Sequence, residues 1–258
     1  MVRRGRFGFT ILEMFVTLGL FGLLGTLCLA ALTEATTVWR KTSSRDGVAR
    51  SLTKAWASLR KDLANAKLSP ASLEIQKVPG SYGGANGFDG DAVCFLSPVD
   101  PGTGLLATKS DGQPFMMRNI IYYCVVPQNH AQLFGSTCSG GADADGYEQQ
   151  CPHKILVRLS RDQGAASNPA QPASEDSIMT SWTSLLTRPN QLGVQSGEDK
   201  IISTQLLTFR CSQVNGLLEL DLRAVAIEEA SRTIGVGTRP LGVGPYTVQQ
   251  KTALRPGN

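Results

Sequence analysis

An apolar stretch interrupted by one carboxylate is the feature that most constrains how this chain can fold. The segment from Phe9 to Leu32 is long and apolar enough to cross a bilayer as a helix. It contains Glu13, and an ionisable side chain inside such a helix is costly and usually has a designated partner. Arginines at positions 3, 4 and 6 precede the stretch without any acidic residue. This charge bias predicts a cytoplasmic N-terminus and export of everything that follows the stretch.

The residues around this carboxylate form a recognisable motif. The octapeptide Gly8-Phe9-Thr10-Ile11-Leu12-Glu13-Met14-Phe15 resembles the cleavage and methylation site of type IV prepilins and the related pseudopilins. In that family a dedicated aspartyl peptidase cuts after the Gly and methylates the new N-terminal Phe. The resemblance implies a leader peptide over residues 1–8, a methylated Phe9, and a transmembrane or filament-core helix over residues 9–32. It also implies that Glu13 pairs with the Phe9 amine of a neighbouring subunit during filament assembly.

Other interpretations of the N-terminus explain less. A signal peptidase site at Cys28-Leu29-Ala30 would need an apolar region of about twenty residues that includes Glu13, whereas about 7–15 is usual. A lipoprotein site at Cys28 would need a small residue before it, and Leu27 is not small. A plain signal anchor agrees with the length but leaves Glu13 unexplained. An anchor whose carboxylate snorkels to the interface is the alternative explanation for that residue.

Composition is consistent with one exported domain of ordinary size behind a long helix. The 258 residues include 25 basic and 21 acidic side chains, and loss of the three leader arginines leaves 22 against 21. A nearly neutral mature chain gives no indication of nucleic acid as a partner through bulk charge.

The cysteines are expected in an oxidising compartment. Cys28 lies in the apolar stretch and is expected to be a small apolar filler. The five exported cysteines are Cys94, Cys124, Cys138, Cys151 and Cys211. Cys138 and Cys151 flank a Gly- and Asp-rich loop and are the best candidates for a loop-closing disulfide. The other three fall in or beside predicted strands, where either disulfides or buried thiols are expected, and the sequence does not pair them.

The helix is predicted to continue as an amphipathic segment over residues 33–69. Its apolar positions recur every three or four residues, which is the period of one helix face. These positions are Val48, Leu52, Ala55 or Trp56, Leu59, Leu63 and Ala66. Ser69-Pro70 predicts the end of the helix, because proline cannot continue it. Residues 42–47 form a weak patch where the helix could bend or melt.

The rest of the chain predicts a β-rich head over residues 70–234. Short apolar or β-branched runs alternate with turn-rich stretches, which predicts an antiparallel sheet packed on the amphipathic helix. The runs are Leu73–Val78, Ala92–Leu96, Ile120–Val126, Ile155–Leu159, Ile201–Phe209 and Leu217–Val225. Residues 235–258 are predicted to be an irregular or disordered tail. The fold class is therefore predicted to be α+β, and the resemblance to prepilins implies a pilin-like layout.

Chemistry in the head is sparsely indicated. Asp143, Asp145 and Glu148 share a Gly-containing loop, which makes them weak calcium candidates, although they do not complete the calcium-loop template. Solvated carboxylates are the favoured interpretation, so no cofactor is predicted. His130 and His153 show no metal-ligand spacing. The chain also lacks a Gly-x-Ser-x-Gly elbow, and no enzymatic activity is predicted.

The segments "AWASLRKDLANAKL", "DAVCFLSP", "NIIYYCVV" and "LLTFRC" resemble J-class pseudopilins and W-class minor pilins. Many major pilins carry a proline at the position of Ala30, which favours the minor classes. The resemblance implies a single-pass bacterial inner-membrane protein with a periplasmic head. It would be processed by a prepilin peptidase and join other pseudopilins near the tip of a type II secretion pseudopilus, in contact with the inner-membrane assembly platform. The alternatives are a minor pilin that primes a type IV pilus for adhesion, motility or DNA uptake, and a membrane-anchored periplasmic enzyme or binding protein.

Overall fold

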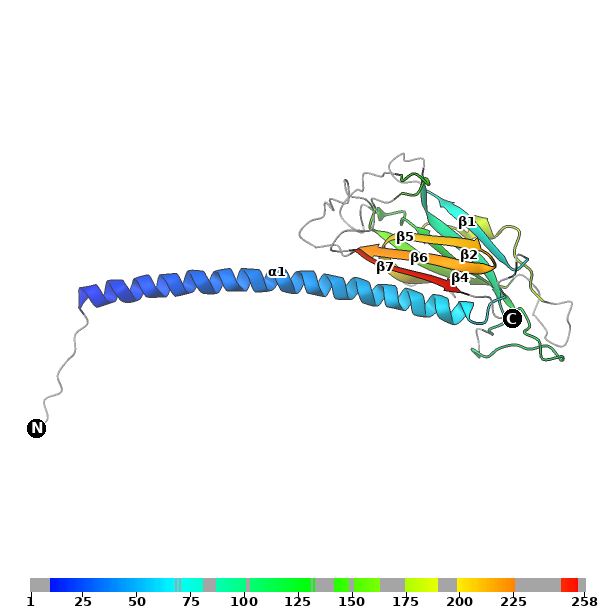
Figure 1. The fold of residues 1–258 in the computed structure, drawn as a ribbon, viewed down its shortest axis with the longest axis horizontal. Helices are drawn as coiled ribbons and strands as arrows, with labels where there is room; N and C mark the ends of the chain where they lie inside the picture. The colour runs from blue at the N-terminus through cyan, green and yellow to red at the C-terminus, as the bar shows by residue number, and fades with distance from the viewer. Residues whose placement is uncertain are drawn as a thin grey trace, which may run out of the picture. The chain divides into compact units, whose positions relative to one another are not determined.

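The computed structural model describes residues 10–67, 69, 71–80, 87–100, 103–130, 132, 142–148, 151–162, 175–189, 199–225 and 247–254. The chain divides into two units, Met1–Ser44 and Arg45–Asn258. Its elements are the helix α1 (Ile11–Leu63), the strands β1 (Leu73–Pro79), β2 (Phe88–Ser97), β3 (Arg118–Val125), β4 (Lys154–Arg161), β5 (Lys200–Val214), β6 (Leu217–Val225) and β7 (Thr247–Leu254), and the short 3-10 helix η2 (Trp182–Leu185) (Figure 1).

The first unit contains the apolar part of α1. Every side chain from residue 10 to residue 43 is exposed, including Phe15, Phe21 and Trp39. The most apolar window of the helix has a mean hydropathy of 2.2 and none of it is buried. By length and composition, α1 is thus able to cross a membrane. An exposed apolar surface of this extent requires lipid or another protein to cover it.

The second unit contains the C-terminal part of α1, which packs on the sheet. The predicted apolar face is confirmed, because Val48, Leu52, Trp56, Leu59 and Leu63 are all buried. They share one core with residues that lie on the facing side of the strands, among them Phe95, Tyr122, Phe209 and Leu220.

Two details of α1 differ from the prediction. The helix ends at Leu63 and not at residue 69, because Ala66 N–H bonds the Leu63 carbonyl (3.2 Å) and Lys67 N–H then pairs with the Leu96 carbonyl of β2 (3.3 Å). A backbone that bonds to a strand cannot also continue the helical ladder. The predicted weak patch at residues 42–47 is helical throughout.

The sheet is a seven-stranded antiparallel meander in which each strand pairs with the next along the chain, from β1 to β7. All six predicted runs are strands, and the pattern of alternating burial expected for Leu217–Val225 is present in β6. The prediction of an irregular tail over residues 235–258 is wrong for β7. This strand pairs with β6, with Lys251 opposite Asp221 (Figure 1). Its side chains include Gln249, Gln250 and Lys251, so it lacks the apolar alternation that reveals a half-buried strand.

The central strands are buried on both faces, which explains their continuous apolar runs. A second core lies on the face away from α1 and includes Ile121, Tyr123, Ile155 and Trp182. The segment 175–189, which contains η2, covers this face. The side chain of Asn119 in β3 holds this segment in place with two hydrogen bonds. Its amide N–H donates to the Ser177 carbonyl (3.0 Å), and its amide oxygen accepts from Met179 N–H (3.2 Å).

The sheet curls so that β2 approaches β5, although two strands separate them in the pairing order. The Asp91 carboxylate of β2 accepts a 2.7 Å hydrogen bond from the backbone N–H of Cys211 in β5. This approach brings side chains from β1, β2 and β5 together, and the loop at residues 142–148 packs beside them.

Candidate functional site

The N-terminal turn of α1 holds Glu13 in a capping box. Thr10 Oγ1 accepts a hydrogen bond from Glu13 N–H (3.3 Å), and Glu13 Oε2 accepts from Thr10 N–H (2.9 Å) and from the Thr10 hydroxyl (2.9 Å). This reciprocal arrangement satisfies backbone donors that otherwise lack partners at a helix start. Sequence reasoning overlooked it, although the Thr-x-x-Glu spacing signals it. The predicted cleavage site at Gly8 and Phe9 lies outside the described residues.

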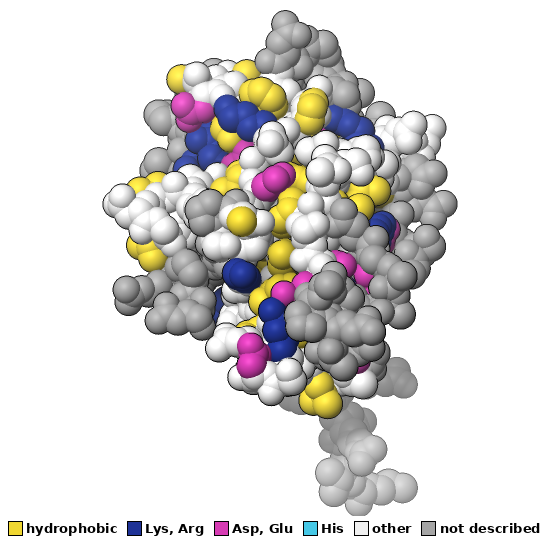
Figure 2. All heavy atoms as spheres, turned by 90° about the vertical axis from the view of Figure 1, so that its right-hand side faces the viewer, with side chains coloured by type: hydrophobic (Ala, Val, Ile, Leu, Met, Phe, Trp, Pro, Cys, Tyr) yellow, Lys and Arg dark blue, Asp and Glu magenta, His cyan; other side chains and the backbone are white. Residues whose placement is uncertain are grey.

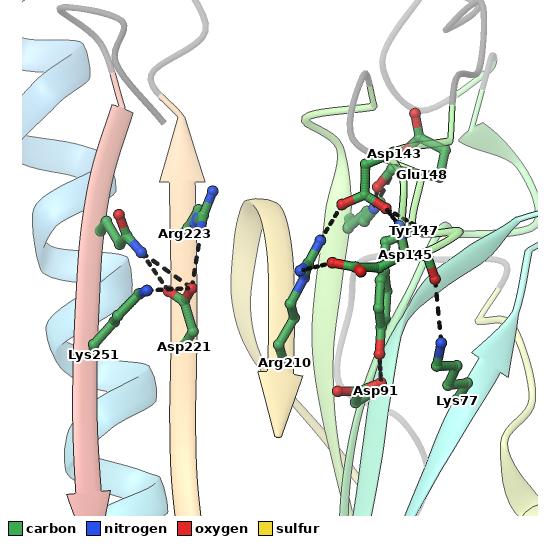
Figure 3. Close-up of polar contacts among 12 residues, drawn as sticks. Lys77, Asp91, Asp143, Asp145, Tyr147, Glu148, Arg210, Asp221, Arg223 and Lys251 are labelled. Carbon is green, nitrogen blue, oxygen red and sulfur yellow. Dashed lines mark hydrogen bonds and ion pairs between the residues drawn. The ribbon is translucent and has the colours of Figure 1, made fainter. Parts of the chain in front are cut away.

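The calcium candidates Asp143 and Asp145 both meet Arg210 of β5. Arg210 Nη1 lies 3.0 Å from Asp145 Oδ2, and Arg210 Nη2 contacts Asp143 Oδ2 (Figure 3). The other oxygen of Asp143 accepts from the N–H groups of Asp145 (3.0 Å) and Tyr147 (2.8 Å). Burial alone would raise the pKa of Asp143, but these hydrogen bonds and the guanidinium lower it below its usual value.

The third calcium candidate, Glu148, faces a different cation. Glu148 Oε2 lies 3.1 Å from Nζ of Lys154, a fully buried lysine, and Glu148 Oε1 accepts from Cys151 N–H (2.8 Å). The loop carboxylates are thus divided between an arginine and a lysine and do not converge on a shared space for an ion. Both oxygens of Asp143 and both of Glu148, together with one oxygen of Asp145, already contact a protein cation or N–H group.

An aromatic ring joins this loop to the sheet. The Arg210 guanidinium lies 4.3 Å from the centre of the Tyr147 ring, and Lys77 Nζ lies 4.8 Å from it. The Tyr147 hydroxyl donates to Asp91 Oδ1 over 2.6 Å (Figure 3). Burial raises the pKa of Asp91, although this hydrogen bond and the one from Cys211 act in the opposite direction. The cluster fastens the loop to β1, β2 and β5 through charge and aromatic contacts.

This cluster lines part of a groove of about 690 Å³, and residues of β6 and β7 line the rest. Asp221 of β6 lies at its other side, where its carboxylate contacts Arg223 (3.0 Å), Lys251 (3.7 Å) and Gln249 (2.9 Å). Acidic and basic groups of the groove therefore neutralise one another. On the face of the molecule that Figure 2 shows, the Lys, Arg, Asp and Glu side chains are likewise interspersed among the residues that are described. Neither surface gathers charge of one sign.

Three of the predicted disulfide candidates are buried thiols. Among the residues that the structure describes, Cys94, Cys124 and Cys211 are not bridged. Burial raises the pKa of Cys94 and Cys124 to about 12, and it raises the pKa of Cys211 as well. These thiols stay protonated at neutral pH and pack as small apolar groups. In the predicted pair of Cys138 and Cys151, Cys138 lies outside the described residues.

The structure brings together His130, Cys151 and His153, a group that sequence reasoning did not find. His130 Nε2 lies 2.7 Å from His153 Nδ1 and 3.4 Å from Cys151 Sγ. All three side chains are buried, with at most 4% of their surface exposed. Cys151 and His153 are only two residues apart, which is the one local signal of the group, whereas His130 comes from beyond the preceding strand.

No protein-family model, curated protein or solved structure matches this chain.

Proposed function

We propose that the chain is a minor pseudopilin, cut between Gly8 and Phe9 by a prepilin peptidase and built into a type II secretion pseudopilus at or near its tip. The observation that carries this proposal is Glu13, the one carboxylate in the apolar stretch 9–32, whose exposed helix continues into a segment packed on an antiparallel head. A membrane anchor alone does not require a carboxylate there. Its partners would be other pseudopilins and the inner-membrane assembly platform.

The capping box suggests how Glu13 serves both the membrane-inserted subunit and the filament. Before assembly, the carboxylate is held by Thr10 through two hydrogen bonds of 2.9 Å, which reduce the cost of placing it in a bilayer. Cleavage leaves a new ammonium on Phe9, next to Thr10 in the chain. In the filament, the same carboxylate pairs with the ammonium of a neighbouring subunit, an attraction that is strong in an apolar medium. When the Glu13 carboxylate exchanges Thr10 for the Phe9 ammonium of a neighbouring subunit, the new ion pair sets the axial register of the incoming subunit.

Intact-mass measurement of the chain from its native membrane tests the processing step. We expect loss of residues 1–8 and the addition of one methyl group on Phe9. An intact chain that starts at Met1, or a cut near Ala30, would contradict the proposal. These results would instead support a membrane-anchored periplasmic enzyme or binding protein.

Two substitutions separate the charge of Glu13 from its capping role. Glutamine preserves a capping box but carries no charge, whereas alanine removes both. We therefore expect Glu13→Gln and Glu13→Ala to be cleaved normally and to be lost from sheared filaments. Glu34→Ala, which removes an exposed carboxylate further along α1, serves as the control and should assemble. Wild-type assembly of Glu13→Gln would reduce the residue to a helix cap and refute the pairing.

The second candidate is a minor pilin that primes a type IV pilus, because every N-terminal feature used above is shared by the two systems. A clean deletion scored in parallel for exoprotein secretion and for surface pili separates them. Lost secretion with intact pili supports the type II assignment. Lost pili with normal secretion assigns the chain to a pilus.

A further inference from the structure

The buried group of His130, Cys151 and His153 has the composition of a transition-metal site. One ligand atom from each of the three side chains, an imidazole nitrogen from each histidine and the thiol sulfur, lies within 4.8 Å of the other two. Imidazole nitrogens and a thiolate are the ligands that zinc and other soft or borderline cations prefer, while calcium and magnesium take oxygen.

Strand pairing explains why residues from separate segments meet. β3 and β4 are antiparallel neighbours, with Val125 opposite Ile155, so the end of β3 and the start of β4 lie at the same end of the sheet. His130 follows β3, and Cys151 and His153 immediately precede β4. The Cys151 backbone is fixed by its N–H bond to Glu148 Oε1 (2.8 Å). The three ligands lie outside the strands themselves, in the segments that follow β3 and precede β4, and the pairing of these strands brings the segments together.

We propose that these three side chains bind one zinc-class divalent cation. In a tetrahedral zinc site, ligand bonds of about 2.0–2.3 Å place neighbouring ligand atoms about 3.3–3.7 Å apart. The 3.4 Å between His130 Nε2 and Cys151 Sγ already falls in that range. The 2.7 Å between the two imidazoles is a hydrogen-bond distance and would open by about 0.6 Å when both nitrogens turn to the metal. Three ligands leave one tetrahedral position for a further donor.

Two other uses of the group are less consistent with its surroundings. A Cys151–His130 nucleophile would need access to a substrate, but Cys151 is fully buried and both histidines are nearly so. A disulfide between Cys151 and Cys138, which the sequence predicts, would consume the thiolate that the metal requires. The disulfide and the metal site are therefore mutually exclusive states of Cys151, and a single sample can be assayed for both.

Metal titration of the full-length chain in detergent tests the proposal. The chain is purified from its native membrane without reductant, dialysed against a chelator, and titrated with zinc chloride or cobalt chloride. We expect one zinc per chain, a dissociation constant below about 1 μM, and cobalt absorption bands of a tetrahedral thiolate site. Zinc at about 100-fold above that constant should raise the Tm by about 5–10 °C.

Matched variants assign the ligands. Cys151→Ser and His153→Gln should each weaken zinc binding at least about 100-fold, since even residues that only support metal ligands contribute 10–100-fold. Cys94→Ser changes a buried thiol in another part of the sheet and should bind zinc as the wild type does.

Three results would overturn the site. The first is a wild-type chain that binds no zinc and shows no cobalt bands. The second is equal binding by wild type, Cys151→Ser and His153→Gln. The third is peptide mapping that finds Cys151 in a disulfide in the chain as purified from the membrane, before any chelator is added. Because the wild-type measurements need no variant to fold, the proposal is decided even if a substitution prevents folding.

Discussion

Arg158 Nε of β4 donates a 2.6 Å hydrogen bond to Asp62 Oδ2 at the end of α1. The same carboxylate oxygen accepts from the Tyr122 hydroxyl of β3 (2.7 Å), and all three side chains are mostly shielded from water. The packed part of α1 is therefore held to the sheet by charge as well as by its apolar face.

Replacement of Asp62 by alanine should destabilise the head by about 2 kcal/mol, because Arg158 and Tyr122 then lose a charged partner in a site with little water. Urea unfolding of the detergent-solubilised chain, followed by tryptophan fluorescence, measures the change. The exposed neighbour Arg60 provides the control, and Arg60→Ala should stay within about 0.5 kcal/mol of wild type. Equal stability of both variants would show that the ion pair contributes nothing.

Gly90 of β2 leaves no room for a side chain, because Cys124 of β3 and Phe209 of β5 lie directly beside it. A Cβ built there would lie 2.8 Å from Cys124 Cβ and 3.2 Å from the Phe209 carbonyl oxygen. Gly90→Ala should therefore destabilise the head by about 1–3 kcal/mol through overpacking.

Gly47 is the matched control for that substitution. It lies in α1 with nothing within 4 Å of its added Cβ, so Gly47→Ala should stabilise the chain by up to about 1 kcal/mol through helix propensity. Thermal unfolding of both variants checks the opposite signs. A stabilising Gly90→Ala would mean that Cys124 and Phe209 do not crowd Gly90 as described.

Trp182 fills the second core from the segment that covers β2 to β4. Only 1% of its surface is exposed, and its indole N–H donates to Glu74 Oε2 of β1 over 2.7 Å. Trp182→Ala should cost about 3–5 kcal/mol, the range for removal of a large buried aromatic side chain. Trp39, which is exposed on α1, is the control, and Trp39→Ala should leave urea unfolding of the head unchanged. A loss below about 1 kcal/mol for Trp182→Ala would imply that the covering segment does not seal this core.

Local periodicity was sufficient to predict most of the fold. The three- and four-residue spacing of Val48, Leu52 and Leu59 identified the packed face of α1, and apolar runs located β1 to β6. Prediction from periodicity failed at two places, where the pairing of backbone groups determines the structure and the burial of side chains does not. The polar strand β7 pairs with β6, and Lys67 leaves the helix to pair with Leu96.

The polar clusters of the head were harder to predict, because their partners are distant in sequence. Asp143 and Arg210 meet only after the sheet has curled, and a carboxylate-rich loop without its arginine looks like a cation site. His130 joins Cys151 and His153 only through the pairing of β3 with β4. The Thr10–Glu13 box, by contrast, is local and can be read from the sequence.

Asp91 should make the stability of the head depend on pH. Burial raises its pKa above the ordinary value of 3.8, so the folded chain binds this proton more readily than the unfolded chain does. The stabilising contribution of the protonated group is complete below pH 3.8 and is lost as the pH rises through the folded-state pKa. Asp89, whose pKa burial also raises, acts in the same direction.

Asp91→Asn removes that titration. Between pH 4 and neutrality, the free energy of unfolding of the variant should therefore fall less steeply with pH than that of wild type. The two slopes should differ by an amount that corresponds to at most one bound proton. Urea unfolding across this pH range measures the two slopes. Asp46→Asn, an exposed change on α1, should follow the wild-type profile. A slope for Asp91→Asn that equals the wild-type slope would show that Asp91 stays ionised in the folded head, and that its hydrogen bonds from Tyr147 and Cys211 outweigh its burial.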